Sequence, residues 1–475
     1  MIPPTKANHY LWGILALGLI LRLSTLPILW NKPLTIVDEK HYQTIAENIL
    51  KHGEFSLQLG TPTAIRPPLY PGFLAFMYSL TGGVNYNTIR LIQSFLSLLI
   101  VYMAYLLAMR LFGRPTALTA ACLIAIYPSF VCFTHLLLTE VLFSLLLISF
   151  LYFYIMSLKQ FSANSEKPFP TWKSRTKWQY IFLAGIFLGL GALTRSILYP
   201  FLPVAIAYFV FVLYRSNGWN SMRGALLLLI GTTIVIAPWS MRNAQLFNQF
   251  VPVGTMGGLN LFMGNYSNTP LFRSWAAIDL PPEKAWYRGN EIVLSSMNEA
   301  EKQKWAVRQA KQFMIDNKTL TIKRSLIKAA QFWGLERSVL ASFIHGHWPE
   351  YKKLGSIVVL AFFIFGMYSL VVIGAIFGFF MNIELNKVEL TYILVVLVYF
   401  TGMHAVVFGH SRYHLPLIPI LCILAAWSIV NYRQMLLQVS CIKFRMAGLS
   451  ALIMVFFWCF ELIIVEGRRF LSLIG

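Results

Sequence analysis

Acidic residues are scarce in this chain, and two of them stand side by side. The sequence has 18 Asp and Glu among 475 residues, against 39 Lys and Arg. Asp38 and Glu39 follow the first long apolar segment, and Glu140 is the only acid between Glu54 and Glu166. A carboxylate can take a proton from a reacting hydroxyl or bind a cation. These three acids are therefore the first candidates for chemistry.

Basic side chains stand at the ends of other apolar segments. Arg195 follows the fifth segment and Arg242 follows the seventh. His410 and Arg412 precede the tenth. A guanidinium group can bind two phosphate oxygens at once. If these ends lie on one face of a membrane, the acids and cations would form an active site at the lipid–water boundary.

Each of these residues also has a structural alternative. Asp38 could serve only as the N-cap of a helix, where Asp is favoured. Glu140 could occupy a first helical turn, where the helix dipole favours an acid. Arg195 and Arg412 could be anchors at the membrane surface. The residue types alone leave these alternatives open.

The composition is that of a protein with many membrane spans. Hydrophobic residues make up 57% of the chain and charged residues 12%, whereas soluble domains carry about 25% charge. The net charge of +21 is spread over loop ends and forms no basic face, so nucleic acid is not an expected partner. Membrane lipids and a phosphate-bearing substrate are better partners. The five cysteines lie in or beside apolar segments and predict packing rather than disulfides.

Apolar segments of about 20 residues predict eleven membrane spans. They are 10–30, 88–109, 115–133, 139–157, 179–194, 197–214, 224–240, 355–380, 389–408, 414–431 and 447–465. The first has no cleavage signal and is interpreted as a retained span. Lys and Arg gather in one set of loops, which predicts that this side is cytoplasmic and that the N-terminus is inside. We expect a multi-pass protein of the plasma (inner) membrane.

Two long segments then face outward. In 31–87, apolar residues at helical spacing predict a short surface helix that includes Tyr42 and ends at Gly53. A second apolar helix in 63–83 is too short to span a membrane.

The second outward segment, 242–354, shows helical patterns at 299–316 and 319–335. It also holds His345 and His347, which are interpreted as surface residues. The predicted division is an N-terminal catalytic membrane region at 1–241, an extracytoplasmic helical region at 242–354 and C-terminal membrane helices at 355–475.

Several motifs together resemble one family, the GT-C fold glycosyltransferases. The group most similar is the protein O-mannosyltransferase-like one that includes the aminoarabinose transferases of lipid A. The motifs, spread over essentially the whole chain, are "VDEKHYQTIAENILKHG" at 37–53, "IRPPLYPGFLA" at 65–75, "LTEVLFSLLL" at 138–147, "GALTRSILYPFLP" at 191–203, "APWSMRNAQLFNQFVPVGTMGGLNLFMGN" at 237–265 and "SRYHLPLIP" at 411–419.

The resemblance implies an all-α membrane protein with the GT-C fold, about eleven transmembrane helices, two outward juxtamembrane helices and an outward helical loop region. It also implies a hexosyl- or pentosyltransferase that takes its sugar from a polyprenyl phosphate. The acceptor would be a lipid, a glycan or a protein on the outer face.

The resemblance also implies residue roles. Asp38 would be the catalytic carboxylate, with Glu39 and Glu140 as further acids of the site. Arg412 would hold the donor phosphate. The remaining assignments are donor phosphate binding by Arg195, His410 and Arg242, and a place in the substrate region for Arg66, Tyr42 and Asn265.

The residue types fit a single displacement. Phosphate is a good leaving group, so the reaction needs a base for the acceptor hydroxyl and cations around the departing phosphate. The sequence identifies no cofactor, and a divalent metal at Asp38 or Glu140 is left open. The alternative function is a transporter or flippase of lipid-linked sugars, which would place its polar residues near mid-membrane.

Overall fold

The computed structural model describes residues 4–163, 173–344, 354–382, 387–437 and 441–466. Over these residues the regular secondary structure is helical except for one two-stranded hairpin, which confirms the predicted all-α membrane fold. The chain divides into two compact units. The first comprises Met1–Gly254 and Ile383–Val395, and the second comprises Thr255–Asn382 and Val396–Gly475.

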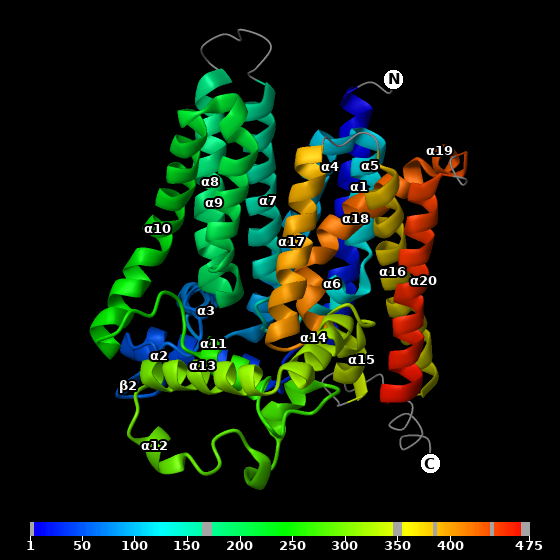
Figure 1. Cartoon of the computed structure of the whole chain (residues 1–475). Helices are drawn as coiled ribbons and strands as arrows, with labels where there is room; N and C mark the ends of the chain where they lie inside the picture. Colours follow the sequence, from blue (N-terminus) through cyan, green and yellow to red (C-terminus); the bar gives the residue numbers. More distant parts are fainter. Residues whose placement is uncertain (1–3, 164–172, 345–353, 383–386, 438–440, 467–475) are drawn as a thin grey trace. The chain divides into compact units, whose positions relative to one another are not determined.

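The first unit is a set of long helices with two short helices at one end. Its elements are α1 (Pro4–Thr25), η1 (Leu26–Leu29), α2 (Val37–His52), β1 (Ser56–Gln58), β2 (Thr61–Pro62), α3 (Leu69–Leu80), α4 (Tyr86–Phe112), α5 (Arg114–Ala125), α6 (Pro128–Phe133), α7 (Glu140–Ala163), α8 (Lys173–Thr194), η2 (Ser196–Leu198), α9 (Phe201–Asn217), α10 (Trp219–Phe247) and the start of α17 (Lys387–Val406). Helices α7, α8, α9 and α10 run side by side, and α2 and α3 lie at one end of them (Figure 1).

In the described part of the chain, nine helices are long and apolar enough to cross a membrane, against eleven spans predicted from the sequence. One difference is at α8, whose apolar part, Trp178–Thr194, is shorter than the other spans.

The other difference is a correction, because the predicted span 115–133 is not one helix. Helix α5 ends at Ala125, and α6 begins with Pro128. Proline has no N–H to continue the helix and disfavours helical backbone in the residue before it. Tyr127 is accordingly extended, with ψ 115°.

The two short helices form as predicted in 31–87, the first segment that the sequence predicts to face outward. Helix α2 ends at Gly53, whose φ of 66° is left-handed and suits glycine. Helix α3 is 12 residues long and follows Pro67 and Pro68. Between them lies the β1–β2 hairpin, which the sequence analysis did not predict.

The second unit contains the predicted helical region of the second outward segment. Its elements are α11 (Met256–Met263), η3 (Ser274–Asp279), η4 (Pro282–Lys284), α12 (Glu291–Ser295), α13 (Glu299–Asp316), α14 (Lys318–Phe332), α15 (Arg337–Ile344), α16 (Leu354–Met381), the rest of α17, η6 (Ser411–Leu417), α18 (Ile418–Val430), α19 (Tyr432–Leu436), α20 (Ile442–Phe460) and η7 (Glu461–Glu466).

The helical patterns at 299–316 and 319–335 correspond to α13 and α14. Helix α13 begins with a capping box between Asn298 and Glu301, and packs on α11 through an apolar cluster that includes Phe262 and Trp305. His345 and His347 lie outside the described residues.

Candidate active site

The first functional pair in the first unit is an ion pair between Asp38 and Arg66. Asp38 is the second residue of α2, and Ile36, not Asp38, is the N-cap. Its Oδ1 accepts a hydrogen bond of 2.7 Å from Nη2 of Arg66, which also lies 3.0 Å from Nδ1 of His41. The Asp38 side chain keeps 32% of its exposure, so this carboxylate is both paired and accessible.

The second pair joins Glu140 and Arg195. Glu140 begins α7 and Arg195 follows α8, so both stand at helix ends. Nη2 of Arg195 donates to Glu140 Oε1 at 2.8 Å, and its Nε donates to Thr139 Oγ1 at 2.8 Å. The Glu140 side chain is fully buried. Arg195 thus pairs with one oxygen of a carboxylate that would be very costly to bury alone.

Tyr42 brings the two pairs into one place. The guanidinium of Arg66 lies over its ring, 5.4 Å from the centroid. Burial raises the pKa of the Tyr42 hydroxyl above its usual value. The next contributions come from the charges of both pairs, with Arg66 and Arg195 lowering this pKa and Asp38 and Glu140 raising it. Two acids more than 100 residues apart therefore act on the same hydroxyl.

Glu39 has a different environment from its neighbour Asp38. It is 2% exposed. Its Oε1 accepts the N–H of Leu137 at 2.8 Å, and its Oε2 accepts the N–H of Ile36 at 3.2 Å. Burial raises its pKa, while these backbone bonds and the charge of Arg90 lower it. Glu39 therefore ties the start of α2 to the loop that leads into Glu140.

The same loop is held from α4 by two side chains that sequence reasoning missed. Arg90 donates from Nε to the carbonyl of His135 at 3.1 Å. Gln93 donates to the carbonyls of Thr134 and Leu136 at 3.0 and 2.8 Å. Both are buried polar residues in an otherwise apolar helix. The available signal was the presence of these two polar residues at the start of a predicted apolar span, because buried polar groups need partners.

Arg242 holds the hairpin of the first unit. Its Nη1 donates to the carbonyl of Thr63 at 2.7 Å, and its guanidinium lies 4.7 Å from the ring centroid of Trp239. A role in binding phosphate stays a prediction for this residue.

The second unit contains His410 and Arg412. Nδ1 of His410 accepts the backbone N–H of Arg412 at 3.0 Å, and its ring meets that of Trp275 edge-on. Burial lowers the pKa of His410 well below its usual value, followed by the charges of Arg412, Arg337 and Arg273. His410 is therefore neutral and able to donate from Nε2. Sequence reasoning missed Arg273 and Arg337, which belong to no motif.

Asn265, which its motif places in the predicted substrate region, forms hydrogen bonds to three other residues of the second unit. Its Nδ2 donates to the carbonyls of Leu261 and Val406, each at 2.8 Å, and its Oδ1 accepts from Lys328 Nζ at 3.0 Å. Lys328 also donates to the carbonyls of Gly264 and Val406. These bonds use both amide atoms of Asn265, and a substrate role for it stays a prediction.

A metal site needs several converging ligands. Within the described ranges, no three His, Cys, Asp or Glu side chains lie together in such an arrangement. Asp38 and Glu140 each face an arginine. We therefore derive no step through a metal.

Comparison with known proteins adds a partial sequence match and a fold. Residues 65–241 match the family model described as dolichyl-phosphate-mannose-protein mannosyltransferase. This range contains Arg66, Glu140 and Arg195 but not Asp38 or Arg412. No curated protein matches the sequence.

The fold is similar to that of the archaeal oligosaccharyltransferase AglB from Archaeoglobus fulgidus, solved with an inhibitory peptide and a dolichol-phosphate. The TM-score is 0.52 at 14% identity, over 95% of this chain and 55% of that one. The apo form of the oligosaccharyltransferase gives 0.54 at 14% identity, over 97% and 56%. This chain thus spans about half the length of that enzyme.

ArnT from Cupriavidus metallidurans, bound to undecaprenyl phosphate, is also similar, with a TM-score of 0.43 at 15% identity over 89% of this chain and 78% of that one. The predicted resemblance to GT-C fold glycosyltransferases is confirmed by the family-model match and by the oligosaccharyltransferase fold.

The buried and hydrogen-bonded position of Glu39 predicts that its replacement by Gln lowers the stability of the fold. In Glu39→Gln, an amide N–H₂ would have to face a backbone N–H that the carboxylate now accepts. Leaving a buried donor unsatisfied costs about 1–3 kcal/mol, so we expect the free energy of unfolding in detergent to fall by that amount. Glu47→Gln, at a partly exposed residue of the same helix whose i,i+4 pair with Lys51 is worth about 0.3–0.5 kcal/mol, should change it by less than about 0.5 kcal/mol. Equal effects of the two substitutions would contradict the bridging role.

The lowered pKa of Lys328 predicts that the stability of the fold depends on pH. Burial, and then the charge of Arg324, lowers its pKa to about 7 from 10.5. Between these values the unfolded chain binds a proton that the folded chain does not, so stability should rise with pH above about 7. The slope should approach about 1.4 kcal/mol per pH unit. Thermal unfolding of the wild type and Lys328→Met from pH 7 to 10 checks this, because the slope should be absent from the variant. The same slope in both proteins would contradict it.

Proposed function

We propose that the chain is a membrane glycosyltransferase that moves a sugar from a polyprenyl-phosphate donor to an acceptor hydroxyl on the extracytoplasmic face. The observation that carries this proposal is the pair of acid–arginine contacts that meet around Tyr42. The family-model match over 65–241 supports it. So does the similar fold of an oligosaccharyltransferase solved with dolichol-phosphate and a peptide.

Asp38 is the proposed base. The acceptor oxygen attacks the anomeric carbon while its proton passes to the Asp38 carboxylate. The bond between the anomeric carbon and the phosphate oxygen breaks, and the polyprenyl phosphate leaves with the electron pair. Arg66 keeps Asp38 ionised, which is the form that can accept a proton. Of the three acids, Asp38 alone combines a first-turn position with a partly exposed carboxylate.

Arg195 is proposed to act on the departing phosphate. Negative charge grows on that group as the bond breaks, and a fixed cation lowers the energy of this state. Thr139 and Glu140 hold its guanidinium by two hydrogen bonds, so little reorganisation is needed. For Arg412, the family resemblance implies contact with the donor phosphate, and neutral His410 beside it would supply an N–H donor.

Glu39 is proposed as a positioning residue rather than a base. Its carboxylate oxygens accept backbone N–H groups and its side chain is buried. By fixing the loop that precedes Glu140 to the helix that carries Asp38, it sets the spacing between the two pairs.

A transporter of lipid-linked sugars is less well supported. In the first unit, the charged side chains stand at the ends of helices: Asp38 at the start of α2, Glu140 at the start of α7 and Arg195 after α8. A transport path would need such groups near the middle of the spans. The proposed location is the plasma membrane, with a lipid, glycan or protein as acceptor.

Asp38→Asn tests the assignment. The substitution keeps the shape of the side chain but removes the proton acceptor, and a general base contributes about 10²–10⁴-fold to rate. We expect sugar transfer to fall by that factor. The measurement is transfer of radiolabelled sugar from a panel of polyprenyl-phosphate sugars to cell-envelope acceptors in membranes that contain the full chain.

Asp279→Asn, at an exposed aspartate of the second unit, is the matched control and should retain full transfer. Full activity of Asp38→Asn would exclude Asp38 as the base. Failure of the wild type to use any donor of the panel would contradict the proposed function.

A further inference from the structure

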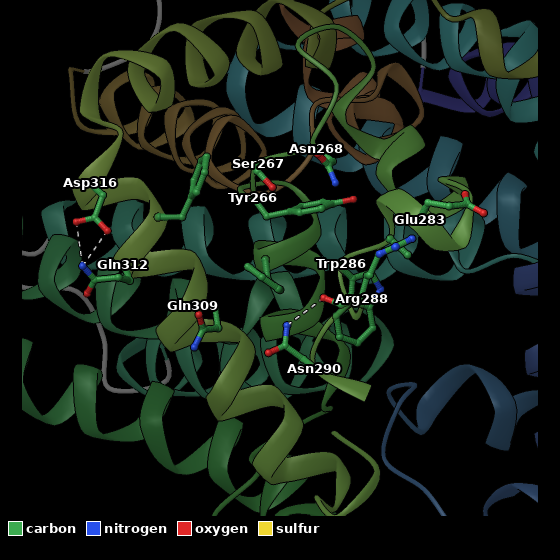
Figure 2. Close-up of a pocket in the computed structure, with 13 residues that line it drawn as sticks. Tyr266, Ser267, Asn268, Glu283, Trp286, Arg288, Asn290, Gln309, Gln312 and Asp316 are labelled. Carbon is green, nitrogen blue, oxygen red and sulfur yellow. Dashed lines mark hydrogen bonds between the residues drawn. The ribbon is translucent and has the colours of Figure 1, made fainter. Parts of the chain in front are cut away.

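The second unit contains a cavity of about 420 Å³ that the proposed reaction does not use. It lies between α13, the end of α11 and the loop that runs from 283 to 290 (Figure 2). This volume is within the range of small-molecule sites, which are about 300–1,000 Å³.

One wall of the cavity is a single face of α13. Gln309, Gln312, Phe313 and Asp316 line it, and their spacing of three and four residues places them on the same side of a helix. The same face of α13 is fixed by packing one turn before Gln309, because Trp305 contacts the lining residue Phe262 with ring centroids 5.3 Å apart. The wall is therefore set on a rigid element.

The other wall is a loop held in place by hydrogen bonds to one carbonyl. Tyr266 donates its hydroxyl hydrogen to the carbonyl of Lys284 at 2.8 Å, and Asn268 donates to the same carbonyl at 3.2 Å. This anchors the segment that carries Glu283, Trp286 and Arg288 along the cavity, as Figure 2 shows.

The lining combines aromatic rings with planar polar groups. Phe313 and Trp286 offer ring surfaces, while Gln309 and Asn290 are amides that can both donate and accept. Within the group drawn in Figure 2, Gln309 makes no hydrogen bond to another lining side chain. Such a cavity offers a ligand both apolar ring surfaces and amide groups that can donate or accept hydrogen bonds.

The charges of the cavity exclude some ligand classes. Glu283 and Asp316 are two acids against one cation, Arg288, so an anionic ligand would be repelled. The two acids stand at opposite ends of the cavity in Figure 2, and they belong to no cluster of three His, Cys, Asp or Glu side chains within the described residues. The polar lining also disfavours a purely apolar ligand, whose burial would leave the amides and carboxylates unpaired.

We propose that this cavity binds a saccharide that carries no negative charge. A sugar ring presents C–H groups on its faces, which suit aromatic rings, and hydroxyls around its edge, which suit amides and carboxylates. Trp286 and Phe313 would contact the faces of the ring. Gln309 and Asp316 would bond the hydroxyls. This goes beyond the proposed function, because binding in the cavity requires neither a lipid-linked donor nor transfer.

Saturation-transfer-difference NMR on the full chain tests the proposal. The chain is kept in a detergent without a sugar headgroup, and the probes are mannobiose, cellobiose and chitobiose. We expect at least one of them to receive saturation from the protein. Binding should weaken about fivefold in Gln309→Ala, which removes one hydrogen-bonding group, and more in Trp286→Ala.

Lys311→Ala, on the same helix but outside the cavity, is the matched control and should bind like the wild type. Gln309 is exposed, so its replacement leaves the fold intact. The proposal is overturned if none of the three disaccharides binds, or if binding is unchanged in Gln309→Ala. It is also overturned if glucose 6-phosphate or a neutral heptapeptide binds more tightly than all three. None of these outcomes depends on sugar transfer, so they are distinct from a failure of the proposed function.

Discussion

A carboxylate in a protein this apolar must be compensated, and the first unit is organised around that requirement. An uncompensated buried charge costs several kcal/mol, and loss of one partner of a buried pair is strongly destabilising. Asp38 and Glu140 each face an arginine, whereas Glu39 accepts two backbone N–H groups. These different partners are the reason for the different roles that we propose. Backbone bonds fix the position of Glu39, whereas the accessible ion pair of Asp38 can take part in chemistry.

Pairing these carboxylates with arginines and backbone N–H groups requires the surrounding helices and loops to lie close to them. Arg66 reaches Asp38 because the hairpin and the proline-rich turn bring the chain back along α2. Glu140 reaches Arg195 because α7 begins where α8 ends. The loop that Glu39 and Gln93 hold lies between α6 and α7 and leads directly into Glu140.

Much of the fold and part of the site could be predicted from local sequence. Periodicity indicated α2 and α13, and Gly53 marked a helix end that its left-handed backbone confirms. The break at Pro128 was missed because the apolar residues on either side continue without a gap. The bond of Glu39 to Leu137, and the contacts of Arg90 and Gln93, depend on segments about 40 to 100 residues away. Adjacent acids look equivalent in a sequence; only the fold gives them different partners.

The central claim is that one accessible acid, Asp38, performs a single displacement while the other acids hold the site. The most direct test is the anomeric configuration of the transferred sugar, read from the one-bond carbon–hydrogen coupling of the product by NMR, with a donor of known configuration. The account predicts inversion. Retention would contradict it, because retention requires a carboxylate to form a covalent bond to the sugar before the acceptor attacks.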